Sequence, residues 1–249
     1  MRCNVSVLAV SIATVGAGPA LAQEWYTGAR ERTAEATYGA AIDASLSATT
    51  RGSLHGSLIG TIAPFSKLDE TGARLRLGGL LGNYTYTSVS PGVGKVNGRE
   101  ASGSFMAGYE WVTKNATFSI YLGGEVQNRT LSKVDPSNGV AGAAWGFKTS
   151  VDFYMNPTSY TMASGNITYS TVNNAYYTRF KVGMAVTEKI FLGPELLFLG
   201  DNFYGQWRVG AHMTGAKVGP MQFGISGGYV NDRRGGPGGY GILDARLGF

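Results

Sequence analysis

Hydrophobic and polar residues alternate along most of the chain with a period of two, which is the period of a half-buried β-strand. In the segment 206–214, the odd positions hold Trp, Val, Ala and Met, and the even positions hold Gln, Arg, Gly, His and Thr. The segment 117–129 repeats this pattern, with an apolar face from Phe118 to Val126 and a polar face on the residues between. No segment of useful length shows the helical period. The pattern therefore predicts an all-β fold.

About twelve such runs follow one another along the chain. Most of them are close to the ~10 residues that a tilted strand needs to cross an outer membrane, whereas strands of soluble sandwiches average nearer ~5–6 residues. The length favours a single antiparallel up-and-down transmembrane β-barrel over a secreted sandwich. The predicted strands cover residues 35–44, 54–63, 72–86, 101–113, 116–130, 142–155, 160–171, 176–187, 190–199, 205–217, 220–231 and 239–249.

The predicted connections between these strands alternate between long and short. Residues 88–100, 131–141 and 231–239 form long connections, whereas 113–115 and 217–220 form tight turns. Outer-membrane barrels have short periplasmic turns and longer outer loops. An even number of strands also returns the chain to the side on which it starts. We therefore expect both termini to lie in the periplasm.

The N-terminus predicts export from the cytoplasm. A short basic start, an apolar stretch over 5–17 and the small-x-small site Ala20-Leu21-Ala22 form a secretory signal pattern with cleavage before Gln23. We expect a signal peptide over 1–22, a periplasmic segment over 23–36 and the barrel over 37–249. The single cysteine, Cys3, lies inside the signal, so we expect no disulfide and no thiol chemistry in the mature protein.

Composition excludes several other classes of protein. The 249 residues include 38 glycines without a Gly-X-Y period, which excludes collagen. Aromatic residues make up 12% and charged residues 15% of the chain, which excludes wholesale disorder. No apolar run of helical-span length follows the signal, which excludes helical membrane spans. The net charge of +5 comes without a compact basic block, so we expect no nucleic-acid partner.

The last predicted strand ends on an aromatic residue. Gly241, Leu243, Ala245 and Leu247 share one face, and the chain closes on Phe249. This pattern resembles the signal that the barrel-assembly machinery recognises in outer-membrane proteins. We therefore expect that machinery and outer-membrane lipid as partners, and the Gram-negative outer membrane as the location. Aromatic residues near the strand ends form the expected girdle: Tyr109, Trp111, Trp145 and Trp207.

In a barrel of this kind the apolar face meets lipid and the polar face lines the lumen. Because an unpaired buried charge is costly, we expect the inward charges to form a structural ion-pair network. A slightly anion-preferring pore, or a passage for a polar polymer, is the alternative. The alternation turns inward the residues Arg74, Arg76, Glu110, Glu125, Arg129, Lys148, Asp152, Arg179, Lys181, Glu195, Arg208, His212, Asp244 and Arg246.

The sequence offers no catalytic site. The two histidines are His55 and His212, and a membrane lipase would need a serine and a histidine together on the lipid-facing side, whereas the alternation turns His212 inward. The glycine-rich segments 79–82 and 235–239 are not phosphate loops, because no helix follows either of them. No metal-ligand spacing is visible. We therefore expect no enzymatic activity, no cofactor and no metal.

Several short strings carry a family resemblance in their order and spacing. They are Ile62-Ala63-Pro64-Phe65, Tyr84-Thr85-Tyr86, the segment 131–138, Gly193-Pro194-Glu195, the segment 206–212 and Gly227-Gly228-Tyr229. Together they resemble the cellulose biosynthesis protein BcsS family over about residues 38–249.

The resemblance implies an outer-membrane barrel associated with bacterial cellulose, an exopolysaccharide of biofilms. We expect a non-enzymatic accessory to cellulose synthesis, export or surface anchoring, with cellulose or other cellulose-secretion components as partners. A general small-solute, porin-like channel is the alternative, and a surface adhesin ranks third because the loops are short. Tyrosines near the predicted outer mouth either contact glycan or belong to the aromatic girdle: Tyr84, Tyr86, Tyr176, Tyr177 and Tyr204.

Overall fold

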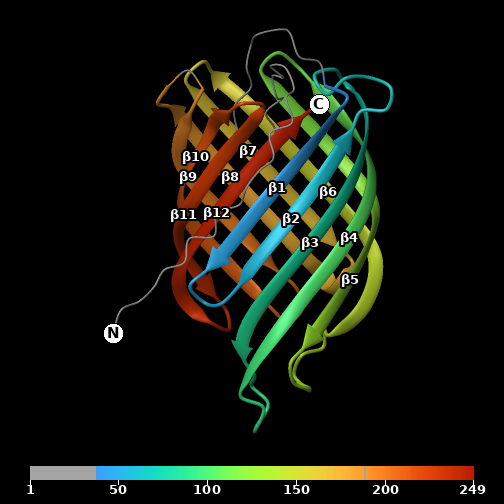
Figure 1. Ribbon diagram of the computed structural model, residues 1–249, viewed down its shortest axis with the longest axis vertical. Coiled ribbons are helices and arrows are strands. Elements are labelled where there is room, and N and C mark those ends of the chain that lie inside the picture. The colour runs from blue at the N-terminus through green and yellow to red at the C-terminus, as the bar shows by residue number, and fades with distance from the viewer. Residues whose placement is uncertain (1–37, 188) are drawn as a thin grey trace.

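The computed structural model describes residues 38–187 and 189–249, in which twelve antiparallel strands form one closed barrel (Figure 1). Each strand pairs with the next one in the chain, and β1 closes the barrel against β12. The strands span Ala40–Thr49 (β1), Leu54–Ile62 (β2), Gly72–Thr87 (β3), Lys95–Val112 (β4), Ala116–Leu131 (β5), Gly142–Thr158 (β6), Thr161–Ser170 (β7), Ala175–Ala185 (β8), Phe191–Gly200 (β9), Gly205–Val218 (β10), Met221–Asp232 (β11) and Gly236–Gly248 (β12), with a 3₁₀ turn (η1) at Val172–Asn174. The predicted antiparallel barrel of about twelve strands is confirmed.

Most predicted strand boundaries lie within three residues of those in the structure, and three boundaries in two strands are wrong. The first strand begins at Ala40 and ends at Thr49, five residues later than 35–44. The fourth begins at Lys95 rather than at residue 101. Residues 95–100 pair with the end of β3, but their outward side chains are polar, so no apolar face reveals this part of the strand. The predicted signal peptide and the segment 23–36 lie outside the described residues.

Both ends of the described chain lie at the same end of the barrel. The backbones of Ala40 and Phe249 are joined by two hydrogen bonds of 3.0 Å. This end is called the terminal end here, and the opposite one the far end; in Figure 1 the terminal end is uppermost. The even number of strands accounts for this placement.

The connections differ in length less regularly than the sequence predicts. The longest connection, 132–141, lies at the far end, but 63–71 at the terminal end is the second longest. The predicted long connection 231–239 is wrong, because β11 and β12 continue through it to a short turn at 233–235. The glycines and the proline of this segment show no hydrophobic alternation, so the sequence does not predict that β12 begins there.

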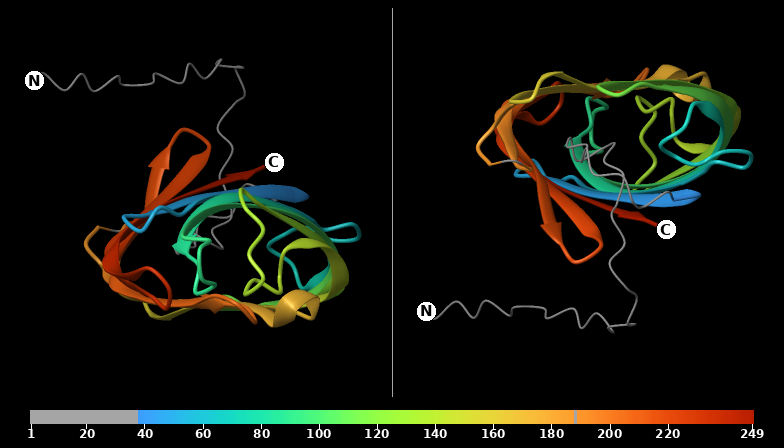
Figure 2. Two further views of the ribbon diagram at one scale, coloured as in Figure 1. Left: turned by 90° about the horizontal axis from the view of Figure 1, so that it is seen from below. Right: turned by 90° about the horizontal axis from the view of Figure 1, so that it is seen from above.

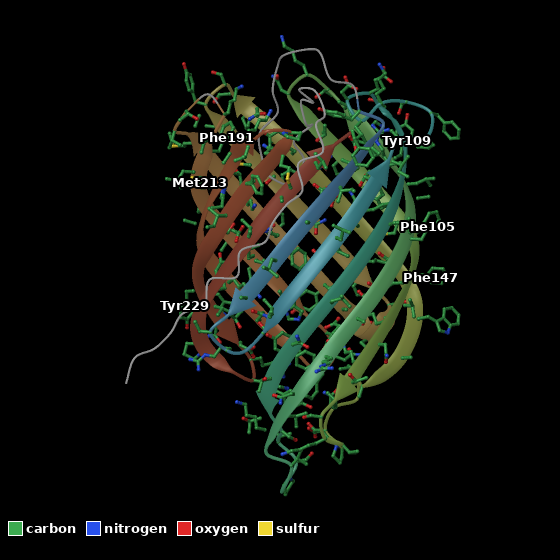
Figure 3. The ribbon with its side chains drawn as sticks, viewed as in Figure 1. Phe105, Tyr109, Phe147, Phe191, Met213 and Tyr229 are labelled. Carbon is green, nitrogen blue, oxygen red and sulfur yellow. The ribbon has the colours of Figure 1, made fainter. Side chains whose placement is uncertain are left out.

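Apolar side chains cover the outside of the barrel wall. Phe105, Phe147 and Tyr229 project away from the wall (Figure 3), and Phe147 is 65% exposed. A soluble protein does not expose a continuous apolar belt of this kind, so the surface indicates a barrel that spans a lipid bilayer. Among the described residues, no helix has the length and apolar character needed to cross a membrane.

Candidate ligand cavity in the barrel lumen

The half of the lumen nearest the terminal end is filled by packed side chains. Tyr121, Tyr154, Met162, His212 and Gln222 point inward from five different strands and are at most 1% exposed. A void of about 10 Å³, which holds about one water molecule at most, lies beside Tyr121 and is also lined by Arg76, Glu110 and Leu68. These buried side chains therefore pack the terminal half more closely than the far half.

The connection 63–71 packs against the terminal end, with Leu68 buried and Phe65 exposed. Arg74 on β3 donates hydrogen bonds to the carbonyl oxygens of Lys67 and Glu70 and, at 2.9 Å, to Ser66 Oγ. Its Nε also lies 3.5 Å from Glu110 on β4. We call residues 63–71, with Arg74 and Glu110, the terminal plug. The sequence indicated only a turn at this position.

Inward charges form ion pairs through both halves of the lumen. Thirteen of the fourteen titratable residues that the alternation turned inward are buried, and Lys148 is half-buried. The pairs are Arg74–Glu110, Arg76–Asp152, Arg129–Glu100, Arg129–Asp201, Lys148–Glu125, Arg179–Glu195, Arg179–Asp244, Lys181–Asp244 and Arg246–Asp43.

The sequence analysis did not predict three acidic members of these pairs. Glu100 lies in the part of β4 that was expected to be a loop, and Asp201 lies in the connection after β9. Asp43 lies on β1, whose position along the chain was expected five residues too early. With these three, eight carboxylates face seven paired cations. The residues that the alternation turned inward include eight basic and five acidic side chains, an excess that favours an anion-preferring pore, but with Asp43, Glu100 and Asp201 the acidic side chains in these pairs also number eight among the described residues.

Arg179 is the centre of the largest group of contacts. Its Nε donates to Glu195 at 2.8 Å, and its Nη1 donates to Asp244 at 3.1 Å. Tyr240 donates to the second oxygen of Glu195 at 3.0 Å, and Ser45 donates to Asp244 at 2.8 Å. A buried ion pair that is satisfied on all sides holds neighbouring strands in register, whereas its loss leaves uncompensated charge.

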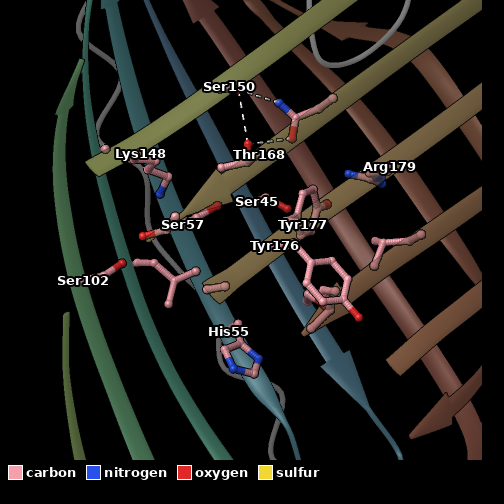
Figure 4. A pocket seen from close by; sticks show the side chains of 18 of the residues that line it. Ser45, His55, Ser57, Ser102, Lys148, Ser150, Thr168, Tyr176, Tyr177 and Arg179 are labelled. Carbon is pink, nitrogen blue, oxygen red and sulfur yellow. Dashed lines mark hydrogen bonds between the residues drawn. The ribbon is translucent and has the colours of Figure 1, made fainter. Parts of the chain in front are cut away.

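The half of the lumen nearest the far end holds a cavity of about 360 Å³ (Figure 4). This volume lies in the range of about 300–1,000 Å³ that is usual for small-molecule sites. Gly78 and Ser104 lie close together in its wall, since a Cβ on Gly78 would lie 2.8 Å from Ser104 Oγ. Eleven charged side chains line the cavity, several of them in the ion pairs above, and nine serine and threonine side chains lie among them: Ser45, Ser47, Ser57, Ser102, Ser104, Ser150, Ser164, Thr168 and Ser170.

The five tyrosines predicted at the mouth all lie toward the far end, but they differ in role. Tyr84, Tyr177 and Tyr204 line the cavity, and Tyr176 lies at its rim with 43% of its surface exposed. Tyr86 is buried outside the cavity lining, where its hydroxyl donates to Asp135 at 2.8 Å. Tyr86 therefore supports the loops rather than the cavity.

Loops lie across the far-end opening of the barrel. The left panel of Figure 2 shows connections 88–94 and 132–141 inside the outline of the wall. Asp135 joins the two, because it accepts hydrogen bonds from Ser88, Ser90 and Ser137 as well as from Tyr86. Burial alone raises the pKa of Asp135, but the hydrogen bonds outweigh it and hold the pKa well below its usual value. The carboxylate therefore stays ionised and keeps the loops together.

The two histidines have different surroundings. His212 is buried in the terminal half, with Nε2 3.0 Å from the carbonyl oxygen of Val182. His55 lines the cavity beside the serines (Figure 4). Within the part of the chain that the structure describes, no group of three or more His, Cys, Asp or Glu side chains is placed to hold a metal ion.

Fold and lumen together define a small transmembrane β-barrel whose lumen is packed at one end and hollow at the other. The sequence profile described as "Cellulose biosynthesis protein BcsS" matches residues 26–249, so the chain belongs to that family. No curated protein matches the sequence.

Solved structures with a similar barrel share little sequence with this chain. The KdgM porin in complex with disordered oligogalacturonate is 12% identical, with 84% of this chain and 99% of that chain covered and a TM-score of 0.43. The translocator domain of the autotransporter NalP from Neisseria meningitidis is 12% identical, with 84% and 87% covered and a TM-score of 0.47. Omp33 from Acinetobacter baumannii is 12% identical, with 86% and 99% covered and a TM-score of 0.39. These similarities concern barrel architecture and carry no conclusion about a ligand.

Proposed function

We propose that this barrel is a non-enzymatic outer-membrane accessory of bacterial cellulose biosynthesis, and that it anchors a glucan chain at the cell surface. Membership of the BcsS family supports the link to cellulose biosynthesis. The observation that carries the anchoring role is the cavity of about 360 Å³ with its hydroxyl lining and its tyrosine rings.

The chemistry of this lining suits a sugar. Serine and threonine hydroxyls both donate and accept hydrogen bonds, as sugar hydroxyls do. The rings of Tyr84, Tyr177 and Tyr204 offer apolar faces against which the C–H groups of a pyranose ring pack. A few placed polar groups around apolar rings are the usual composition of a small-molecule site.

The packed terminal half supports anchoring over transport. A glucan that passed through the barrel would need a continuous lumen, and so would a general small-solute channel. Met162 and Tyr121 fill the terminal half at 0% and 1% exposure, and the terminal plug packs against its end. Both the export role and the porin-like alternative are therefore less well supported than a surface-anchoring role.

Anchoring at the surface requires that the far end faces outward. The predicted signal peptide and the position of the longest connection, 132–141, support a terminal end in the periplasm. Val134 at the far end and Phe65 at the terminal end are both 89% exposed. With single cysteines introduced at these two positions, an impermeant maleimide should label Val134→Cys but not Phe65→Cys in intact cells. The reverse labelling would overturn the orientation.

Bilayer recordings and a binding titration together test the function. We expect the refolded barrel to give no steady conductance and to bind cellotetraose in detergent. A large conductance that cello-oligosaccharides leave unchanged would contradict anchoring and favour the channel.

The proposal also includes outer-membrane lipid, the barrel-assembly machinery acting on the strand that ends at Phe249, and cellulose or other cellulose-secretion components as partners.

A further inference from the structure

One lumen cation differs from all the others in the described part of the chain. Seven inward Lys and Arg residues lie within ion-pair distance of a carboxylate, whereas Arg208 on β10 has no such partner among the described residues. Arg208 is 2% exposed and lines the cavity. A buried charge without a counter-ion is costly, so this position calls for an explanation.

The contacts of Arg208 use only part of its hydrogen-bonding capacity. Its Nε donates to Gln206 at 2.9 Å, and its Nη1 donates to Ser47 at 2.7 Å. The guanidinium lies 5.2 Å from the ring centre of Tyr240, which gives a weak cation–π contact. A guanidinium carries five N–H donors in a planar fork that matches a carboxylate, so donors remain for a ligand.

The nearby carboxylate of Asp232 is occupied elsewhere. It accepts hydrogen bonds from the Tyr204 hydroxyl and from the backbone N–H groups of Arg234 and Gly235. Gln206 stands between the two charges, because it accepts from Arg208 and donates to the Tyr204 hydroxyl at 2.6 Å. Neutral groups therefore separate Arg208 from the acid that could have neutralised it.

We propose that the cavity binds an acidic saccharide, with its carboxylate on Arg208 and its hydroxyls on the serine lining. Ser47 and Tyr177 line the same cavity as Arg208, which brings sugar-binding groups and the free cation into one space. The inference deepens the proposed function: the anchored polymer carries acidic sugar units, or an acidic saccharide accompanies it.

A titration with three probes tests the inference on the full barrel in detergent. The probes are cellotetraose, the same tetrasaccharide with a primary hydroxyl oxidised to a uronic acid, and sodium acetate. We expect the acidic tetrasaccharide to bind roughly tenfold or more tightly than the neutral one, since hydrogen bonds to a charged partner are the stronger ones. Equal affinities would overturn the inference and leave the proposed function standing, whereas failure of both saccharides would overturn both. Acetate binding as tight as that of the acidic tetrasaccharide would reduce the site to a simple anion site and overturn the saccharide part.

Substitutions test whether Arg208 causes the preference for the acidic tetrasaccharide over the neutral one. Arg208→Gln should abolish the difference between the two tetrasaccharides, and Arg208→Lys should restore part of it because the charge is kept. Arg99→Gln, which removes an exposed arginine on β4, is the matched control and should change nothing. A preference that survives Arg208→Gln would overturn the assignment. Heat-modifiable migration in gels shows whether each variant is folded, so a folding failure cannot be mistaken for a binding defect.

Discussion

The two halves of the lumen are built on the same strands and yet have opposite character. Toward the terminal end, the inward positions hold large side chains such as Tyr154, Met162 and Phe191, which pack into one buried cluster. Toward the far end, the inward positions hold Ser57 and Ser102 around the cavity. The number of strands sets the width of the barrel, so the volume of the inward side chains decides whether a given level is filled or hollow.

Charge distinguishes the two halves as well. In the terminal half, Arg74 is tied to Glu110 and Arg246 to Asp43. In the far half, Arg208 faces the cavity without a carboxylate partner in the described part of the chain. The far half therefore combines paired cations such as Arg179 with one, Arg208, whose charge has no carboxylate partner among the described residues.

The largest expected effect on stability comes from removing the ion pairs of Arg179. Arg179→Gln should destabilise the barrel by about 3–5 kcal/mol, because it leaves Asp244 and Glu195 buried without their main partner. Arg208→Gln should leave stability unchanged or raise it, since no carboxylate loses a partner. Urea unfolding in lipid vesicles measures both variants. Equal losses in the two variants would mean that Arg208 belongs to the structural network.

Truncation of a packed side chain should cost more in the terminal half than in the far half. Met162→Ala should lower the free energy of unfolding by about 2–5 kcal/mol, as for other buried large-to-small changes. Ser102→Ala beside the cavity should change it by less than about 0.5 kcal/mol. The same unfolding assay measures the free energy of unfolding of both variants. A cost for Ser102→Ala equal to that for Met162→Ala would contradict the division into a packed and a hollow half.

Filling the hollow half should remove binding without unfolding the barrel. The double variant Ser57→Phe with Ser102→Phe places two rings in the cavity, and cellotetraose affinity should fall roughly tenfold or more because the ligand space is occupied. Phe147→Leu on the outer face is the control for a substitution that leaves the lumen untouched. Titration calorimetry provides the measurement, and undiminished binding would place the saccharide site elsewhere.

The smallest effect concerns acid and the far-end loops. The pKa of Asp135 is lower in the folded state than in the unfolded chain, so its contribution is fully present above the unfolded value of about 4 and is lost as the pH falls through the folded value. Amide exchange in 132–141, expressed relative to the intrinsic exchange rate at each pH, should therefore be unchanged from about pH 7 to 5 and should rise only below about pH 4. Asp135→Asn should remove this pH dependence. A rise between pH 7 and 5 in the wild type would point to another titrating group.

Much of the lumen could be predicted because alternation is a local property. A strand turns every second residue inward, so Arg179, Glu195 and Asp244 could be placed in the lumen one strand at a time. The same reasoning missed Glu100, because the outward residues of this part of β4 are Lys95, Asn97 and Arg99 and show no apolar face. The serine lining was also overlooked, although Ser45, Ser57 and Ser102 occupy the same inward phase as the charges.

By itself, the sequence determined an antiparallel barrel of about twelve strands, with apolar residues outside and charged residues inside, since both follow from a period of two over successive runs. Only the tertiary structure decided which inward residues meet. Arg179 and Asp244 are far apart in the chain and come together across the lumen because closure between β1 and β12 sets the stagger of every strand. The same closure brings the large side chains to one level and the small ones to another. The plug and the cavity are therefore properties of the closed barrel, and no single strand predicts them.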